Sequence, residues 1–312
     1  MKVCIIGGGW VGCHLTNILK KRFNVRLFES SHLFSGTSFY NQNRLHLGYH
    51  YCRSYNTRKL CQDTFNRFIA DYGHMVDSVD NNIYAIPLNR SLLDYNSYCK
   101  IFEDEDTHER VKLNILNNIE GYISVREKFI DPNKAKKYFT DVLAENLTIK
   151  SISLDDIEKL KNEYDLVINC TNNSLDPIKT NHNTYNEVCH SLIYRKKKQL
   201  PFGALTLVDG KFFSIYPYDN NNLFTLTDVE ITPRLNLSIE ERRRLMEKKV
   251  LYYFNDFLDY FEYDSFFTSK KVKYVSESDS RVPLIDKNSN YIRAFTGKIQ
   301  GIYLIQDYIE SL

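Results

Sequence analysis

The sequence predicts an α/β fold in which a parallel sheet and a second, mostly antiparallel sheet are built from interleaved stretches of chain. Apolar, β-branched runs suited to buried parallel strands occur near the start, the middle and the end of the 312 residues. Between about 184 and 231 the sequence pattern changes to one typical of short strands separated by turns, with Asp209-Gly210 as a hairpin signal. We therefore expect two discontinuous domains rather than two consecutive ones.

The first 29 residues read as strand, turn, helix and strand. Lys2 to Ile6 is a short apolar run, and the six residues that follow, Gly7-Gly-Gly-Trp-Val-Gly12, fit the pattern G-x-G-x-x-G. The segment 14–22 has helical periodicity, and the segment 24–28 is a second strand closed by Glu29. This order and spacing are those of a Rossmann-type dinucleotide-binding unit.

Each residue of this motif has a physical role in holding a dinucleotide. Gly7 permits the tight turn, Gly9 lets the backbone approach a pyrophosphate, and Gly12 lets the helix pack closely on the strand. Trp10 and Val11 lie at the helix N-terminus, where backbone N–H groups and a partial positive charge face the phosphates.

The acid at the end of the second strand narrows the choice of cofactor. Glu29 can accept hydrogen bonds from both hydroxyls of a ribose, and its charge would repel a 2′-phosphate. The sequence therefore favours FAD or NAD over NADP.

Composition excludes several other classes of protein. The net charge of +2 gives no strong field toward nucleic acid or a membrane, and no segment reaches the length of a transmembrane helix. The seven cysteines include no Cys-x-x-Cys pair, so we expect reduced thiols and no metal site. We expect a cytoplasmic protein whose partner is a small-molecule substrate.

Four stretches together resemble the D-amino-acid-oxidase-type FAD-dependent oxidoreductases, the family that includes glycine and sarcosine oxidases. They span nearly the whole chain and are the motif 7–12 with Glu29, the segment 36–48, the strand 165–171, and the segment 281–301. Two positions depart from the family pattern: Asn172 stands where glycine is usual, and Thr16 where alanine is usual. The chain is also short for the family.

The resemblance implies FAD as the cofactor and a division into two domains. We expect an FAD-binding domain formed by 1–75, 128–180 and 275–312, and a substrate domain formed by 76–127 and 181–274. The resemblance adds further cofactor-binding residues to the first motif: Arg44, Leu45, Thr171, Gly297, Lys298 and Gly301.

The same resemblance implies candidate catalytic residues. His46 and His50 would lie near the flavin, where an imidazole can act as acid or base because it titrates near neutral pH. Arg281 would pair with a substrate carboxylate, a task that suits a planar guanidinium. Tyr218 could close the pocket, although core packing is the ordinary role of a tyrosine here.

The function that follows is FAD-dependent oxidation of a small amine or amino acid, with hydride transfer to the flavin. One alternative is a mutase-like flavin enzyme that acts on a sugar nucleotide, because Gly48-Tyr49-His50 is similar to a flavin segment of the galactopyranose mutases. A second alternative is a nucleotide-binding protein without catalysis.

Overall fold

The computed structural model describes residues 1–103, 108–110, 114–178, 184–219, 222–275 and 280–312. The chain divides into two compact units, each assembled from separated stretches. Unit 1 comprises Met1–Phe39, Pro132–Asn186 and Lys271–Leu312, and unit 2 comprises Tyr40–Asp131 and Glu187–Lys270. The predicted α/β class, with one largely parallel and one largely antiparallel sheet, is confirmed.

The expected domain boundaries differ from this division mainly at residues 40–75. These residues lie in unit 2, because strand β3 (Arg44–Leu45) pairs with β8 (Lys128–Ile130), which also pairs with β4 (Val76–Ser78). Helix α2 (Tyr55–Tyr72) lies between β3 and β4 in the chain, and β3 and β4 are the two edge strands of this small sheet.

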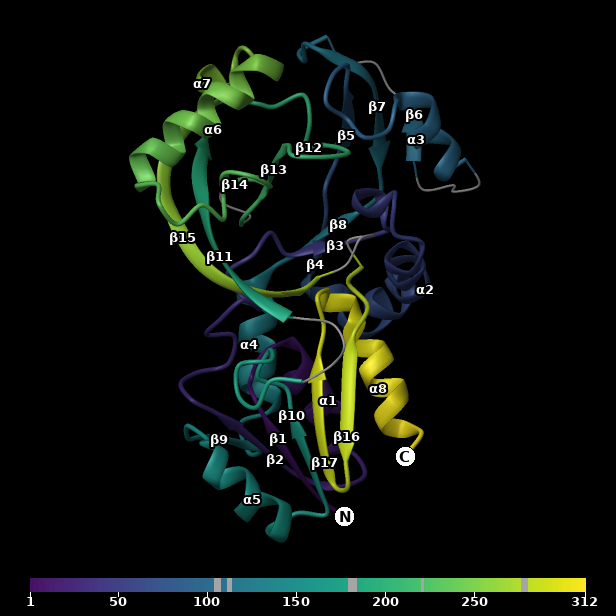
Figure 1. Ribbon diagram of the computed structural model, residues 1–312, viewed down its shortest axis with the longest axis vertical. Helices are drawn as coiled ribbons and strands as arrows, with labels where there is room; N and C mark the ends of the chain where they lie inside the picture. Colours follow the sequence, from purple (N-terminus) through teal and green to yellow (C-terminus); the bar gives the residue numbers. More distant parts are fainter. Residues whose placement is uncertain (104–107, 111–113, 179–183, 220–221, 276–279) are drawn as a thin grey trace. The chain divides into compact units, whose positions relative to one another are not determined.

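Unit 1 is built on a six-stranded sheet in the order β16-β17-β10-β1-β2-β9 (Figure 1). All neighbouring strands are parallel except β16 and β17. The strands are β1 (Lys2–Ile6), β2 (Asn24–Glu29), β9 (Leu147–Ile149), β10 (Leu166–Asn169), β16 (Leu284–Asn288) and β17 (Tyr291–Phe295). The helical segments are α1 (Trp10–Leu19), α4 (Pro132–Val142), α5 (Leu154–Glu163), η3 (Ile299–Gly301) and α8 (Ile302–Glu310).

Helices cover both faces of this sheet. Ile157 of α5 belongs to one apolar cluster with Cys4 and Val167, on one face. Gly12 of α1 approaches Ile5 on the opposite face, where a Cβ atom would be 3.4 Å from the Ile5 side chain. Because both faces are buried, β1 and β10 are nearly continuous apolar runs, which made them recognisable in the sequence.

Unit 2 is built on an eight-stranded sheet in the order β15-β11-β14-β13-β12-β5-β7-β6. The strands are β5 (Asn82–Pro87), β6 (His108–Arg110), β7 (Ile119–Val125), β11 (Thr184–Lys196), β12 (Ala204–Leu207), β13 (Phe213–Pro217), β14 (Leu223–Asp228) and β15 (Phe261–Tyr274). The remaining helical segments are η1 (Tyr49–Tyr51), η2 (Gly73–Met75), α3 (Tyr95–Ile101), α6 (Ile239–Tyr253) and α7 (Phe257–Tyr260). The predicted hairpin at Asp209-Gly210 joins β12 and β13, which pair antiparallel.

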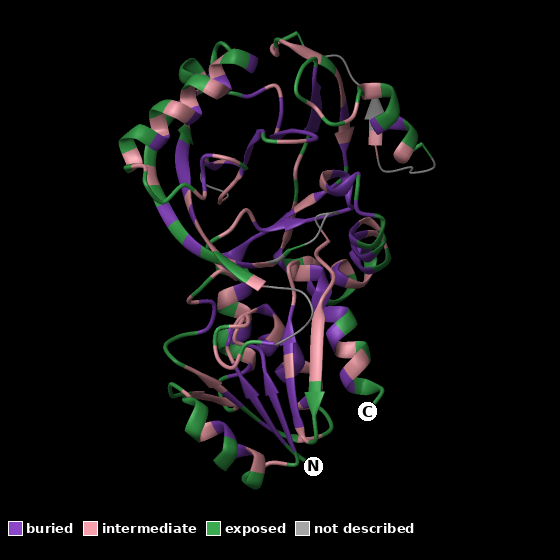
Figure 2. Ribbon diagram, in the orientation of Figure 1, coloured by how far each residue is buried: buried purple, intermediate pink, exposed green. Residues whose placement is uncertain are grey.

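The two faces of this sheet differ in chemistry. Leu205, Ile215 and Leu226 pack with Met246 and Val250 of α6 in an apolar core. Alternate residues on the same strands point the other way and are largely polar: Thr206, Ser214, Tyr216 and Thr225. These four residues are buried as well, and the burial of the central strands is visible in Figure 2. A buried polar face is unusual, and it must satisfy its hydrogen bonds internally or with a ligand.

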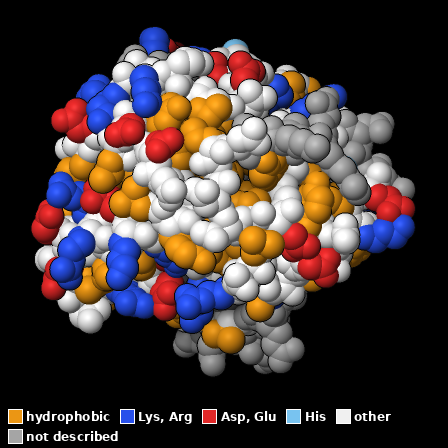
Figure 3. Space-filling view, turned by 90° about the horizontal axis from the view of Figure 1, so that it is seen from above, with side chains coloured by type: hydrophobic (Ala, Val, Ile, Leu, Met, Phe, Trp, Pro, Cys, Tyr) orange, Lys and Arg blue, Asp and Glu red, His pale blue; other side chains and the backbone are white. Residues whose placement is uncertain are grey.

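The surface is mixed in charge, as the small net charge predicts. In the face of the molecule shown in Figure 3, basic and acidic side chains are interspersed around hydrophobic ones. None of the helices in the described ranges combines the length and apolarity needed to cross a lipid bilayer.

Candidate functional site

The glycine-rich turn after β1 has no room for side chains. Gly7 has a φ of +106°, and a Cβ atom there would lie 2.8 Å from the Cys170 carbonyl oxygen. A Cβ atom on Gly12 would overlap the carbonyl oxygen of Gly7. Both glycines are thus required by the close approach of backbone to backbone, as the motif predicts.

Helix α1 begins directly at this turn and points an unshielded N-terminus toward it. Gly9 is the N-cap residue, no side chain caps the helix, and no acidic residue lies in the first turn, which contains Val11. The Trp10 N–H donates to Ser38 Oγ at 3.0 Å, while the Trp10 ring packs edge-on against Phe34 in the core. The first turn therefore offers a partial positive charge and contains no carboxylate of its own, which suits a phosphate group.

Glu29 ends β2 beside the glycine turn. Its Oε2 accepts a hydrogen bond from the Gly8 N–H at 2.6 Å, and its Oε1 accepts from Ser30 Oγ at 2.9 Å and from the Ser31 N–H at 3.2 Å. These contacts hold the carboxylate in place, and an ionised carboxylate can accept further bonds from ribose hydroxyls. The position and the accepting capacity of the Glu29 carboxylate thus fit the adenosine end of FAD.

The strand end that carries Thr171 lies next to the same turn. The Thr171 Cα would be 3.2 Å from a Cβ atom on Gly7. Asn172, which replaces the usual glycine, has a φ of +54°, in the left-handed region. Asparagine is among the few residues that tolerate this region, so the substitution keeps the backbone path that a glycine would give.

The C-terminal segment forms a second tight turn in unit 1. A Cβ atom on Gly297 would be 3.2 Å from Cδ of Arg281, and one on Gly301 would overlap Thr296 Oγ1. The Lys298 N–H donates to Thr296 Oγ1 at 3.2 Å, which shapes the turn before α8. Arg281 therefore lies in unit 1, against this turn.

The order of strands brings these pieces of unit 1 to one edge. Strands β17, β10, β1 and β2 are consecutive and parallel, so their carboxyl ends lie side by side. The glycine turn, Thr171 and the C-terminal turn follow three of those ends, and Glu29 closes the fourth. Ligands of open parallel sheets bind at this edge.

In unit 2, strand β3 presents Arg44 to the polar face of the eight-stranded sheet. The guanidinium donates through Nη1 to Thr206 Oγ1 at 2.8 Å and through Nη2 to Gln42 Oε1 at 3.0 Å. Its Cζ lies 4.1 Å from the centre of the Tyr216 ring. Leu45 points the other way and is fully buried. Arg44 is only 7% exposed, and no carboxylate of the described chain forms an ion pair with it.

His46 is two residues beyond Arg44 and meets a buried acid, Glu127. The His46 Nδ1 is 3.3 Å from Glu127 Oε2, and the same oxygen accepts the Tyr84 hydroxyl at 2.7 Å. Burial opposes the charge of Glu127, but the adjacent His46 and the hydrogen bonds outweigh it and lower the pKa of this carboxyl to about 2. Glu127 is therefore ionised inside the protein.

The two remaining catalytic candidates in unit 2, His50 and Tyr218, pack against aromatic rings. The rings of His50 and His46 are 6.2 Å apart, and His50 also packs against Tyr51 at 5.1 Å. Tyr218 stacks on Phe267 at 5.5 Å, and burial raises the pKa of its hydroxyl. Tyr216, rather than Tyr218, contacts Arg44.

The sequence reasoning did not single out Glu127, Tyr84, Gln42 or Thr206. Gln42 lies within the segment 36–48 but was given no role, and the other three lie outside the stretches that carry the resemblance. Glu127 stands between Arg126 and Lys128, and such a charged run ordinarily indicates a solvated surface.

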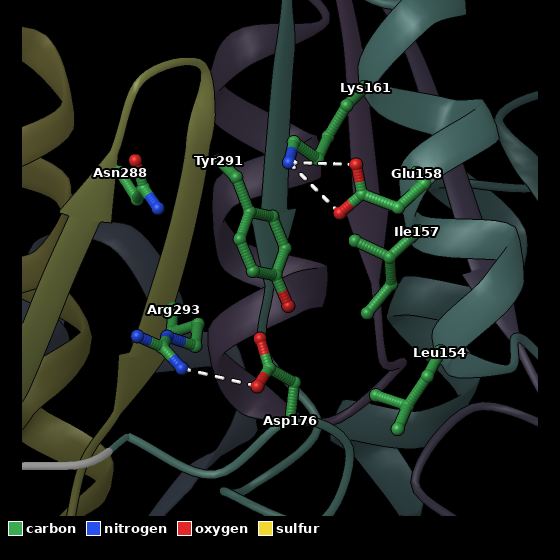
Figure 4. Close-up of a pocket in the computed structure, with 8 residues that line it drawn as sticks. All are labelled: Leu154, Ile157, Glu158, Lys161, Asp176, Asn288, Tyr291 and Arg293. Carbon is green, nitrogen blue, oxygen red and sulfur yellow. Dashed lines mark hydrogen bonds and ion pairs between the residues drawn. The ribbon is translucent and has the colours of Figure 1, made fainter.

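A separate pocket of about 260 Å³ lies in unit 1 (Figure 4). Its two cations are already paired, Lys161 with Glu158 at 3.0 Å and Arg293 with Asp176 at 3.2 Å. We assign it no ligand. Within the described ranges, no group of His, Cys, Asp and Glu side chains is arranged to hold a metal ion.

Comparison with known proteins agrees with this geometry. The model of the DAO family, described as FAD dependent oxidoreductase, matches residues 2–304. The chain belongs to this family. It is 32% identical to the FAD-dependent monooxygenase FPY4 of Fusarium mangiferae, over 99% of this chain and 90% of that protein. It is 24% identical to the FAD-dependent monooxygenase kojA of Aspergillus flavus, over 100% of this chain and 85% of that protein.

Among solved structures, glycine oxidase from Geobacillus kaustophilus has a similar fold. The TM-score is 0.76 at 11% sequence identity, with 99% of this chain and 94% of that chain covered. The chain is thus an FAD-dependent oxidoreductase, as the sequence predicted. When bound, FAD supplies a two-electron acceptor.

Replacing Gly9 by valine should give folded protein that lacks FAD. A Cβ atom at this position would lie 2.7 Å from Ser38 Oγ, and the valine methyls would fill the space before the helix N-terminus. The absorbance of purified protein near 450 nm measures bound flavin. Gly36→Val is the matched control, because nothing lies within 4 Å of a Cβ atom there. A yellow, stoichiometrically loaded Gly9→Val protein would contradict the role of this turn.

Replacing Glu29 by alanine should weaken FAD binding by about 1–3 kcal/mol, the scale of a hydrogen bond to a charged group. Titration of the apoprotein with FAD gives the dissociation constant. Glu158→Ala serves as a control, since Glu158 is an exposed acid of the same unit. Equal affinity in Glu29→Ala and the wild type would mean that this carboxylate does not hold the cofactor.

Stability should depend on pH through Glu127. Its folded pKa of about 2 is below the ordinary value of 4.5, so its stabilisation is full above pH 4.5 and is lost as the pH falls toward 2. Across this window the unfolding free energy of the wild type should fall by up to about 1.4 kcal/mol per pH unit more than that of Glu127→Gln. Urea unfolding at several pH values measures both slopes, and parallel slopes would refute the assignment.

Proposed function

We propose that this chain oxidises a small amine or amino acid, with FAD as the hydride acceptor. The observation that carries the proposal is the buried Arg44 guanidinium, which has no carboxylate partner in the described part of the chain. A buried cation is costly unless an anion offsets its charge. A substrate carboxylate would supply that anion and would accept a guanidinium well.

Glu127, a buried acid of the same unit, is already engaged by other groups. Glu127 already accepts hydrogen bonds from the Tyr84 hydroxyl and from the backbone N–H groups of Leu47 and Gly48, and it faces His46. The guanidinium instead donates to a hydroxyl and an amide, both neutral. This leaves a positive charge on the polar face of the sheet, as a site for a small anionic molecule needs.

The cofactor-binding roles in unit 1 belong to the same proposal. The amides of Gly9, Trp10 and Val11 at the start of α1 would hold the pyrophosphate, and Glu29 would hold the adenosine ribose. We further propose that Thr171, Gly297, Lys298 and Gly301 contact the remainder of FAD. Leu45 would form part of the wall near the flavin, with His46 and His50 as the acid or base. Tyr218 stays a candidate for closing the pocket.

Arg281 is a second candidate for the carboxylate. It lies in unit 1 with its side chain against Gly297. The two arginines can be told apart by mutation. Only the arginine that binds the carboxylate should, when replaced, raise KM selectively for substrates that carry one.

The similarity to two fungal FAD-dependent monooxygenases favours a second candidate function, a monooxygenase. Such an enzyme places one oxygen atom of O₂ in its substrate and takes electrons from an external reductant. An amine oxidation instead draws both electrons from the substrate itself. The two reactions are thus separated by what reduces the flavin.

Anaerobic bleaching of the flavin tests these possibilities. A panel of amino acids and amines, a panel of UDP- and TDP-sugars, and NADH or NADPH are each mixed with the protein. We expect bleaching by at least one amino acid or amine. Bleaching only by a reduced nicotinamide, with ¹⁸O from O₂ appearing in a product, would establish the monooxygenase instead. Spectral shifts with a nucleotide sugar and no bleaching would favour the sugar-nucleotide alternative.

The matched variants are Arg44→Gln and Arg281→Gln. We expect Arg44→Gln to raise KM for an amino acid by about 100-fold or more, since one partner of a buried ion pair costs several kcal/mol. KM for an amine without a carboxylate should change little, and flavin content should be unchanged. The same pattern in Arg281→Gln but not in Arg44→Gln would transfer the role to Arg281.

A further inference from the structure

Glu127 is the centre of a buried polar network in unit 2. It lies between β7 and β8, and its side chain has no solvent exposure. Four groups surround its two oxygens. Oε1 accepts from the N–H groups of Leu47 at 2.8 Å and Gly48 at 3.1 Å, and Oε2 accepts from the Tyr84 hydroxyl at 2.7 Å and faces His46 Nδ1 at 3.3 Å.

This arrangement fixes which nitrogen of His46 carries a proton. An ionised carboxylate can only accept hydrogen bonds, and Glu127 is held in that form. The Tyr84 hydroxyl keeps its proton and donates it to Oε2, because burial raises the pKa of this hydroxyl far above neutral. His46 Nδ1 must therefore donate to Oε2, so Nδ1 carries a proton in the charged ring and in the neutral one, and the neutral ring is left with an unprotonated Nε2.

The same carboxylate also fixes the backbone beside the histidine. The two N–H groups that donate to Oε1 belong to Leu47 and Gly48, which follow His46 directly in the chain. Gly48 has a φ of +100°, and a Cβ atom there would lie 2.9 Å from Cα of Arg58. The ring and its backbone are thus oriented by a single group, which is a stronger constraint than one hydrogen bond.

We infer that Glu127 is a positioning residue that keeps the proton of neutral His46 on Nδ1 and thereby assigns proton exchange with the substrate nitrogen to Nε2. The inference rests on the proposed amine oxidation. Nothing in the sequence motif assigns Glu127 a role.

The proton and the electrons balance in the following way. The ammonium group of the substrate gives one proton to Nε2, which converts His46 to an imidazolium whose charge Glu127 offsets. The neutral amine then loses the C–H electron pair as a hydride to FAD, and the product is the protonated imine. No further reactant is needed for this half of the reaction.

Other charged and titratable groups face His46 and bear on its pH dependence. The His50 ring is 6.2 Å away, and the Tyr51 ring is 5.6 Å away. Arg44 lies two residues earlier in the chain, in β3. Glu127 is distinguished from these by its direct contact with the imidazole.

The test replaces Glu127 by glutamine in the holoenzyme and observes His46 directly. In ¹⁵N-labelled wild type, the histidine two-bond NMR spectrum should show His46 protonated at Nδ1 near neutral pH. In Glu127→Gln we expect the Nε2-protonated form to become populated. The midpoint of the His46 titration should also move down by about one pH unit or more, since an adjacent opposite charge shifts titration by 1–3 units. His46→Asn identifies the signals.

Kinetics give the second readout. With an amine or amino acid that bleaches the flavin, the acid limb of kcat/KM should move to lower pH in Glu127→Gln, and kcat should fall by about 10-fold to 100-fold. That loss is part of the usual general-base contribution of 10²–10⁴. Glu127→Asp should restore part of kcat, and Glu127→Gln should have no added effect in a His46→Asn background.

Tyr98→Phe controls for simple loss of a buried polar contact. Tyr98 is fully buried, and its hydroxyl donates to the Tyr49 carbonyl oxygen at 2.8 Å. It should lower the melting temperature without changing the His46 tautomer. An unchanged tautomer and an unchanged acid limb in Glu127→Gln would overturn the inference. If no amine bleaches the flavin, the proposed function fails, whereas the NMR result still decides the role of Glu127 toward His46.

Discussion

A single buried carboxylate organises the second unit. An ionised acid in a protein interior is tolerated only when donors surround it, and Glu127 meets this need with groups from separated segments. Tyr84 comes from β5, while His46 and the two amides after it come from the segment that follows β3. The charge therefore fastens the segment that carries Arg44 and His46 to the rest of the unit. Removing it would disturb position and charge together.

The first unit depends on a different constraint, the close approach of backbone to backbone. At Gly7 and Gly12 no side chain fits, because carbonyl oxygens occupy the space that a Cβ atom would need. Asn172 shows that the constraint is on conformation and not on residue type, since its φ of +54° serves where glycine is usual. The strand order then places three tight turns at one edge. The constraints at this edge thus act on the path of the main chain.

The sequence predicts unit 1 well because its signals are local. The glycine motif, the buried strand and Glu29 lie within 29 residues, and each is recognisable without its partners in space. Unit 2 is less predictable because its site is assembled from distant residues. Glu127 has charged neighbours in the chain, and only the fold brings it to His46. The helical stretch 239–260 is divided into two helices, α6 and α7, because the turn-favouring Asn255-Asp256 interrupts it. The long strand β15 lacks a clear apolar alternation and was not predicted.

Charge balance at Arg44 favours an amino acid over a simple amine as the substrate of the proposed reaction. Glu127 contacts His46, whereas the hydrogen bonds of Arg44 go to a neutral hydroxyl and a neutral amide. Because Glu127 offsets the charge of a protonated His46, the charge of Arg44 stays uncompensated by it, which the low-dielectric interior opposes. A substrate carboxylate at Arg44 would cancel that charge. The proposed anchor and the proposed base would thus each have a counter-ion, the substrate carboxylate for Arg44 and Glu127 for His46.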